Sequence, residues 1–275
     1  MKEVQRSKYT KSGLGKASRP QLAAVLRAST GTITPTIAAK TLSIPQIEAA
    51  KLLSRWAAQG WLQRVRRGLY IPVSLESDRV DSAPQDPWVI AAAAFAPCFV
   101  SGWSAAEHLS LTEQIFRTLS ISTARRLRNR EPTLGGTAFR LRTVPRSAFF
   151  GLATVWRGRT RVQVSDASRT VVDLLADPSL GGGLRSSVDI FREYLRLTAV
   201  RNVPQIVAYA KTLGVGAVFK RLGYLLEQLA PDEQAAIAAC AASMTQGYAK
   251  LDPALPPARL VTAWRLWLPE GWTLQ

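Results

Sequence analysis

The sequence predicts an α+β protein in which an N-terminal winged helix-turn-helix is followed by a mixed α/β domain with a helical C-terminal part. Three observations predict this architecture. Residues 33–73 hold two helix-like segments around a tight turn, followed by two short strand-like segments. From residue 88 onward, short apolar strands alternate with helices, and beyond residue 183 the pattern is mainly helical. The length of 275 residues is enough for two domains.

The winged helix-turn-helix is predicted from three helices and a hairpin. The helices are expected over residues 20–29, 37–42 and 45–59, and the tight turn is Ser43-Ile44-Pro45. Pro45 suits the first position of the third helix, because its missing N–H costs nothing there. Apolar residues recur at three- and four-residue steps, the spacing of one buried face, and they are Ile44, Ala49, Leu52, Leu53 and Trp56.

The hairpin follows Gly60, which stands where a helix commonly ends in a left-handed residue. Two strands are expected over residues 61–65 and 68–73, joined by the basic turn Arg66-Arg67. This hairpin is the expected wing.

Burying the apolar face of the third helix turns its polar residues outward, on the helix that such folds place in the major groove. Glutamine bonds adenine and lysine bonds guanine at base edges, whereas arginine also holds phosphates. The candidate DNA-binding residues are Gln46, Glu48, Lys51 and Arg55 on the helix, and Arg64, Arg66 and Arg67 on the wing. The alternative is a module used only for protein contact, with an ordinary solvated face.

The charge of the chain points to a polyanionic partner. Lys and Arg number 36 against 19 Asp and Glu, which gives a formal net charge of +17. The basic arm over residues 1–19 is expected to follow DNA beside the folded module, or to be only a solubilising tail. No apolar run reaches the length of a membrane span, and no secretory signal is recognised. A cytoplasmic protein is therefore expected.

Four parts are expected along the chain: the arm 1–19, the winged helix 20–75, an acidic and proline-bearing linker 76–87, and a second domain 88–275. In the second domain, the expected strands are 98–101, 116–122, 138–144, 153–157 and 160–164. The expected helices are 88–95, 104–109, 166–176, 186–199, 204–213, 215–229 and 232–242. The tryptophan-bearing C-terminal stretch is expected to pack back on this domain.

A second nucleic-acid surface is the candidate role of the cluster Arg125, Arg126, Arg128 and Arg130, which follows a predicted strand. Arginines at alternate positions of a strand face one way. Two further basic stripes are therefore expected, one from Arg140 with Arg142 and one from Arg157 with Arg159 and Arg161. The alternative is a set of solvated surface arginines.

No catalytic constellation is found, and we expect neither an enzyme nor a metal site nor a cofactor. The single histidine, His108, is expected to be structural. Cys98 and Cys240 lie far apart beside apolar residues and are expected to be small core residues. Asp173 and Asp177 share a helical face, where capping and solvent exposure account for them.

Three segments resemble AbiEi-type antitoxins. The run 60–70, GWLQRVRRGLY, is similar to the wing of that family, and 100–109, VSGWSAAEHL, is similar to the strand-then-helix that opens its second domain. Residues 165–175, SDASRTVVDLL, resemble its Asp-x-x-Arg-Thr-x-x-Asp element. The segments occur in the family's order and span about residues 20–200. The helical tail beyond residue 200 matches no family that we recognise.

The resemblance implies an autorepressing antitoxin of a type IV toxin–antitoxin, or abortive-infection, system. It implies that the winged helix binds inverted repeats in the promoter. It also implies that the second domain opposes a nucleotidyltransferase-like toxin without forming a stable complex. Two alternatives stay open: a solitary transcription regulator whose second domain binds a ligand or a protein, and a nucleic-acid enzyme that uses the winged helix for targeting.

Overall fold

The computed structural model describes residues 15, 17–73 and 86–274. Most of the expected arm and of the expected linker lies outside the described residues. By its contacts the chain divides into two compact units. Unit 1 consists of residues 1–98, 125–141 and 154–162, and unit 2 consists of residues 99–124, 142–153 and 163–275. Each unit therefore combines segments that are far apart in the sequence.

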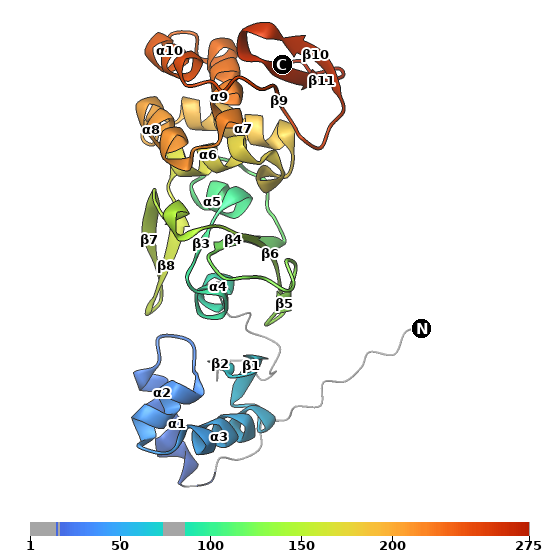
Figure 1. Ribbon diagram of the computed structural model, residues 1–275. Helices are drawn as coiled ribbons and strands as arrows, with labels where there is room; N and C mark the ends of the chain where they lie inside the picture. The colour runs from blue at the N-terminus through green and yellow to red at the C-terminus, as the bar shows by residue number, and fades with distance from the viewer. Residues whose placement is uncertain (1–14, 16, 74–85, 275) are drawn as a thin grey trace. The chain divides into compact units, whose positions relative to one another are not determined.

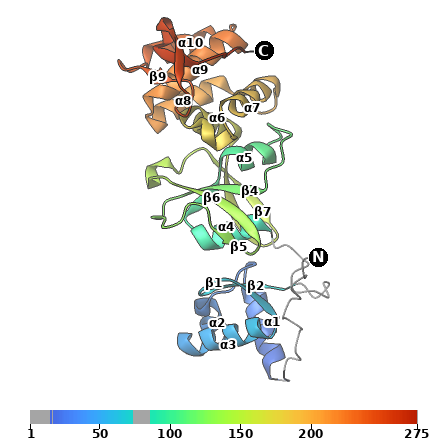
Figure 2. The same cartoon turned by 90° about the vertical axis from the view of Figure 1, so that its right-hand side faces the viewer.

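Unit 1 begins with three helices, α1 Ser18–Ala28, α2 Pro35–Leu42 and α3 Gln46–Ala58, which lie together in Figure 2. The hydroxyl of Thr34 caps α2 by accepting from the Ile37 N–H at 3.3 Å. The tight turn forms because Ser43 takes a left-handed conformation, with φ 55°, and ends α2. The three helices therefore fit a helix-turn-helix type of domain.

A short antiparallel hairpin follows, with β1 Leu62–Arg66 and β2 Leu69–Pro72. Its turn lies one residue later than expected, because Arg66 still pairs with Leu69 at the end of the ladder. Gly68 supplies the positive φ of 75° that this turn needs, and only glycine adopts it without strain. The hairpin is extended by Ile33, whose N–H donates to the Tyr70 carbonyl at 2.7 Å and whose carbonyl accepts in return at 2.9 Å.

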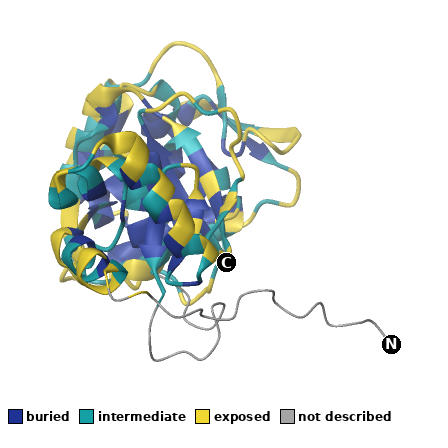
Figure 3. Ribbon diagram, turned by 90° about the horizontal axis from the view of Figure 1, so that it is seen from below, coloured by how far each residue is buried: buried dark blue, intermediate teal, exposed yellow. Residues whose placement is uncertain are grey.

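The core under these helices uses the apolar face of α3 that the sequence predicts. Ala49, Leu53 and Trp56 are completely buried, whereas Ile44 and Leu52 pack at its margin. Figure 3 shows how buried and exposed residues alternate along the helices. The other buried members of this core are Leu22, Val25, Ile33, Ala38, Leu62 and Tyr70.

The middle of the chain forms a six-stranded sheet with the strand order β5–β6–β4–β3–β8–β7. Helix α4 Pro87–Phe95 precedes it, and the Asp86 carboxylate caps this helix by accepting from the Trp88 N–H at 2.8 Å. The strands are β3 Cys98–Val100, β4 Thr118–Thr123, β5 Thr133–Leu134, β6 Thr137–Thr143, β7 Leu152–Arg157 and β8 Thr160–Ser165. Of these, only β5 was not expected.

Unit 2 is mostly helical (Figure 1). One hydrophobic core joins its helices, with Phe191, Ile206 and Leu222 among the most buried residues. The helices are α5 Gly102–His108, α6 Ala167–Ala176, α7 Leu184–Arg196, α8 Val203–Leu213, α9 Gly216–Leu229 and α10 Gln234–Ala242. These bounds agree with the expected ranges to within a few residues.

A small C-terminal sheet was not expected from the sequence. Its strands β9 Ala249–Lys250, β10 Pro257–Val261 and β11 Leu266–Pro269 have the order β10–β11–β9 (Figure 1). Trp264 lies between two of them, packs on Gly223 of α9 and donates its indole N–H to Glu227 at 2.8 Å. Because a Cβ at Gly223 would lie 2.0 Å from the Trp264 ring, this close approach needs a glycine. The stretch therefore packs back on unit 2, as expected, but as a sheet.

Candidate nucleic-acid interface

The outer face of α3 carries the candidate base-reading residues. Gln46, Glu48, Lys51 and Arg55 are all exposed, on the sides of the helix that the buried face leaves open. The structure thus places all four at the surface, and their contact with DNA stays a prediction. At 3.6 residues per turn, Lys51 lies nearly opposite the buried Ala49 and Leu53, and is therefore central to the outer face.

Gln46 lies at the edge of that face and already has a partner. Its side-chain amide donates to the hydroxyl of Thr36 on α2 at 3.2 Å. A bidentate bond to adenine uses the amide oxygen and one of the two amide N–H groups, so the second N–H remains for Thr36. A residue that the sequence analysis did not select, Ile47, is 72% exposed beside Gln46. The sequence does indicate this residue, because Ile47 is apolar but lies outside the apolar repeat that predicts the buried face.

The three arginines of the β1–β2 hairpin differ in their surroundings. Arg64, Arg66 and Arg67 are all exposed. Arg66 also donates from Nη2 to the carbonyl of Ala94, near the C-terminal end of α4, at 3.3 Å. Partial burial and then the nearby charge of Arg125 lower the pKa of Arg66. All three arginines thus reach solvent, but Arg66 is in addition bound to the end of α4.

The second arginine cluster meets the hairpin at that same carbonyl. Arg125 donates from Nη1 to the Ala94 carbonyl at 2.8 Å, so two guanidinium groups share one acceptor where the helix dipole is negative. Its neighbours Arg126, Arg128 and Arg130 are exposed, and none of their side chains makes a described ion pair. The structure thus brings together two clusters that lie about sixty residues apart in sequence.

The β7–β8 hairpin also contacts the N-terminal helices through its basic residues. Arg159 donates to the Arg27 carbonyl at the end of α1 at 3.0 Å, and the Thr160 hydroxyl donates to the Thr30 carbonyl. Arg157 stacks on the Trp88 ring at 4.5 Å, whereas Arg161 lies over Trp156 at 5.8 Å.

The basic stripe expected from Arg157, Arg159 and Arg161 is therefore wrong. The chain reverses at Gly158, so these residues do not alternate along one strand. Arg157 and Trp156 are neighbours on β7 and point to opposite faces, and Arg161 sits with Trp156. Arg142, expected in the other stripe, is bound to Asp173 at 3.0 Å.

Charge is distributed very unevenly between the two units. Unit 1 has 22 Lys and Arg against 7 Asp and Glu, a formal net charge of +15. Unit 2 has 14 against 12, a net of +2. Almost all of the chain's excess positive charge therefore belongs to the unit that contains α3 and the Arg125–Arg130 segment. A net charge of this size attracts polyanions that come within about a Debye length of the protein.

The Asp-x-x-Arg-Thr-x-x-Asp element is buried in unit 2. Asp166 caps α6 by accepting from the Arg169 N–H at 2.7 Å, and its other oxygen accepts from the Tyr209 hydroxyl at 2.9 Å. Arg169 and Asp173 form a fully buried ion pair at 3.2 Å. Solvent exposure of Asp173 was therefore a wrong expectation, because its two partners Arg169 and Arg142 neutralise it within the fold.

The remaining bonds of Arg169 explain why it can be buried. Its Nη1 donates to the carbonyls of Ala148 and Phe150 at 2.8 and 2.9 Å, and its guanidinium lies 4.1 Å from the centre of the Phe150 ring. Each of its three guanidinium nitrogens thus has a partner, either Asp173 on α6 or a carbonyl before β7. The element ties α6 to the segment before β7, and a structural role accounts for it.

The single histidine and the two cysteines differ in their surroundings. His108 is exposed at the end of α5. Burial raises the pKa of Cys98 and of Cys240 to about 12, so both thiols stay protonated at neutral pH. Among residues 15, 17–73 and 86–274, no group of three or more His, Cys, Asp or Glu is placed to hold a metal ion.

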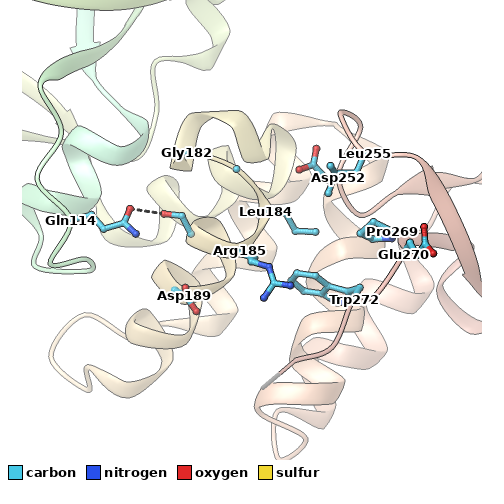
Figure 4. A pocket seen from close by; sticks show the side chains of 12 residues that line it. Gln114, Gly182, Leu184, Arg185, Asp189, Asp252, Leu255, Pro269, Glu270 and Trp272 are labelled. Carbon is cyan, nitrogen blue, oxygen red and sulfur yellow. Dashed lines mark hydrogen bonds between the residues drawn. The ribbon is translucent and has the colours of Figure 1, made fainter.

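Unit 2 contains a cavity of about 490 Å³ between the start of α7 and the C-terminal sheet (Figure 4). Arg185 and Trp272 lie next to each other along its wall, and Ser186 donates to Gln114 at 3.2 Å. Three carboxylates, those of Asp189, Asp252 and Glu270, also line it. The lining thus offers one cation against three anions, which does not favour a polyanion.

Taken together, the three N-terminal helices of unit 1 fit a helix-turn-helix type of domain, and unit 1 is strongly basic. Residues 20–73 match the family model described as "Transcriptional regulator, AbiEi antitoxin". The resemblance that the sequence indicated is thus confirmed over this segment. The match covers α1 to β2 and ends where the first described range ends.

Comparison with solved structures shows a similar fold over nearly the whole chain. The crystal structure of the RV2827C protein from Mycobacterium tuberculosis superposes with a TM-score of 0.62 and 16% sequence identity. The alignment covers 92% of this chain and 90% of that one. No curated protein sequence matches this chain. Within the described ranges, no helix has the length and hydropathy to cross a membrane.

Proposed function

We propose that this protein is a DNA-binding transcriptional regulator that represses its own promoter as the antitoxin of a type IV toxin–antitoxin system. In this proposal residues 20–75 act as a winged helix-turn-helix, α3 enters the major groove of promoter repeats, and the β1–β2 hairpin is the wing. The observation that carries the proposal is the exposed polar face of α3, presented within a unit of net charge +15. The match of residues 20–73 to a regulator family supports it.

The division of roles follows the surroundings of each cation. Lys51 is central to the outer face of α3, so we assign it to a base edge, with Arg55 and Glu48 beside it. The three hairpin arginines are exposed, and Arg64 and Arg67 are assigned to phosphates because Arg66 also donates to the Ala94 carbonyl. The exposed Arg126, Arg128 and Arg130 are assigned to phosphates farther along the same DNA.

The proposal is tested by binding of the full chain to the DNA upstream of its own gene. Affinity for that DNA should exceed affinity for unrelated DNA. It should fall by roughly three to five decades between about 50 and 200 mM salt if 6–10 phosphates are contacted. Lys51→Ala should cost about 1–3 kcal/mol and relax sequence preference. Lys211→Ala removes a lysine of unit 2 that is also exposed, and it should leave binding unchanged. Equal binding to both DNAs at every salt would contradict sequence-specific recognition.

The antitoxin part of the proposal has its own test. We propose that unit 2 opposes a nucleotidyltransferase-like toxin without a stable complex. Co-expression with such a toxin encoded next to this gene should restore growth, while the two proteins should not co-purify. Growth arrest despite full expression of the folded chain would limit the function to transcription regulation.

A second candidate is a regulator that responds to a small molecule. The cavity of about 490 Å³ in unit 2 favours it, because ligand pockets commonly enclose 300–1,000 Å³. Its carboxylates and Trp272 suit a cationic or zwitterionic compound. Release from promoter DNA by such a compound, and its loss in Asp252→Asn, would support this candidate.

A further inference from the structure

Ile47 is an apolar side chain in the middle of the polar outer face of α3. It is 72% exposed and lies in the same helix turn as Gln46 and Glu48, which are exposed as well. Single exposed apolar residues are common on protein surfaces, so exposure alone does not assign a role. The position of Ile47 on the helix supplies the second observation.

At 3.6 residues per turn, Ile47 and Lys51 lie one turn apart on the same face. Ala49, Leu53 and Trp56, which are completely buried, occupy the opposite side of the helix. Ile47 is thus aligned with the lysine that is most central to the outer face. It also lies in the first turn of α3, directly after the tight turn that begins at Ser43. Recognition helices contact base edges with their N-terminal residues.

The major groove contains one apolar group that differs between bases, the C5-methyl of thymine. Apolar side chains recognise it, whereas cytosine presents no methyl at that position. From these observations we infer that Ile47 is a specificity-determining residue that contacts a thymine methyl in the promoter DNA. This inference rests on the proposed function, because it requires α3 to enter the major groove.

The contact adds information that the cations of α3 do not supply. Lys51 selects a hydrogen-bond acceptor such as guanine, and Ile47 selects a methyl group about one helix turn away. The side-chain amide of Gln46 is bound to Thr36 and therefore lies toward α2, away from the centre of this face. Ile47 and Lys51 therefore form the recognition pair, with Gln46 at its margin.

The test compares two forms of the same promoter fragment, amplified with either dTTP or dUTP. Uracil keeps the pairing edge and the O4 acceptor of thymine but lacks the methyl group. The full-length wild-type protein should bind the dU form about fourfold more weakly for each thymine methyl contacted, which is the effect of removing one buried methylene-sized group from contact. Ile47→Ala should bind the two forms equally and match the wild-type affinity for the dU form.

Two controls separate this contact from general effects. Ile115→Ala truncates an isoleucine of unit 2 that is 87% exposed, and it should keep the full preference for the dT form. Any change in DNA shape caused by uracil affects all three proteins alike and cancels in the comparison. The thermal unfolding midpoint of Ile47→Ala should stay within the error of the wild type, since the side chain is 72% exposed.

Equal binding of both DNA forms by the wild type, together with specific promoter binding, would overturn the inference and leave the proposed function intact. Retention of the dT preference by Ile47→Ala would also overturn it, because another group would then contact the methyl. A changed oligomeric state of Ile47→Ala with an unchanged dT preference would assign the side chain to a protein interface. Failure of the wild type to distinguish its promoter from unrelated DNA would overturn both proposals.

Discussion

The arginines of unit 1 lie at the surface, whereas two arginines of unit 2, Arg169 and Arg221, are almost completely buried. In unit 1 every described arginine except Arg157 is exposed. In unit 2, Arg221 donates to the carbonyls of Leu175 and Ala176 at the end of α6 and to the carbonyl of Lys250. Burial lowers the pKa of Arg221, but these carbonyls satisfy its donors.

The difference shows that one residue type serves two purposes in this chain. Arginine in unit 2 connects backbone segments and neutralises a buried carboxylate. Arginine in unit 1 remains largely hydrated and, with few acids nearby, creates a field that attracts polyanions. Even in unit 1, some guanidinium groups donate to carbonyls near helix C-termini, namely those of Arg66, Arg125 and Arg159. A count of basic residues alone does not separate these purposes.

The largest expected effect concerns the buried ion pair of unit 2. Asp173→Asn removes the charge that balances Arg169 and should lower the free energy of unfolding by about 3–5 kcal/mol, since it leaves an uncompensated buried cation. Urea denaturation of the full chain measures this. Asp189→Asn breaks the exposed pair with Arg192 and should change stability by less than about 1 kcal/mol. Similar losses in both variants would show that the Asp173 site is not rigidly buried.

A smaller effect is expected from the exposed arginines of unit 1. Changing Arg126, Arg128 and Arg130 together to Ala should weaken all DNA binding alike and reduce the salt slope by two to three units, at about 0.9 per phosphate contact. Arg125 is left in place because it holds Ala94.

The matched control for that variant removes three exposed cations from unit 2, namely Arg185, Lys211 and Arg259. The control should leave the salt slope unchanged. An equal decrease in both variants would mean that only net charge matters. An unchanged slope in the unit 1 variant would assign its three arginines to ordinary solvated surface.

The smallest expected effect separates two adjacent arginines of the β1–β2 hairpin. Arg67→Ala should reduce the salt slope of promoter binding by about one unit, because its side chain faces solvent. Arg66→Ala should change the slope less, because Arg66 donates to Ala94 instead. Titration of binding against salt for the two single variants measures the difference. A larger effect of Arg66→Ala would show that this arginine leaves Ala94 to contact DNA.

Most local elements of this protein are determined by short-range sequence patterns. The apolar repeat of Ala49, Leu53 and Trp56 fixed which side of α3 is buried, and therefore which side is exposed. Asp166 caps α6 through a local contact, because capping involves groups three residues apart. The family resemblance depended on three such local segments, and the family model matches over residues 20–73, which contain the first of them.

Only the tertiary structure decided which charged residues are available at the surface. The sequence predicted an exposed Asp173, but in the fold it is buried between Arg169 of its own helix and Arg142 of β6. The carbonyl of Ala94 joins Arg66 and Arg125, and no local pattern predicts an acceptor shared by segments so far apart. The C-terminal sheet was missed because its strands have two to five residues and depend on packing against α9. Periodicity reports the local partners of a residue, whereas burial and ion pairing depend on contacts between distant segments.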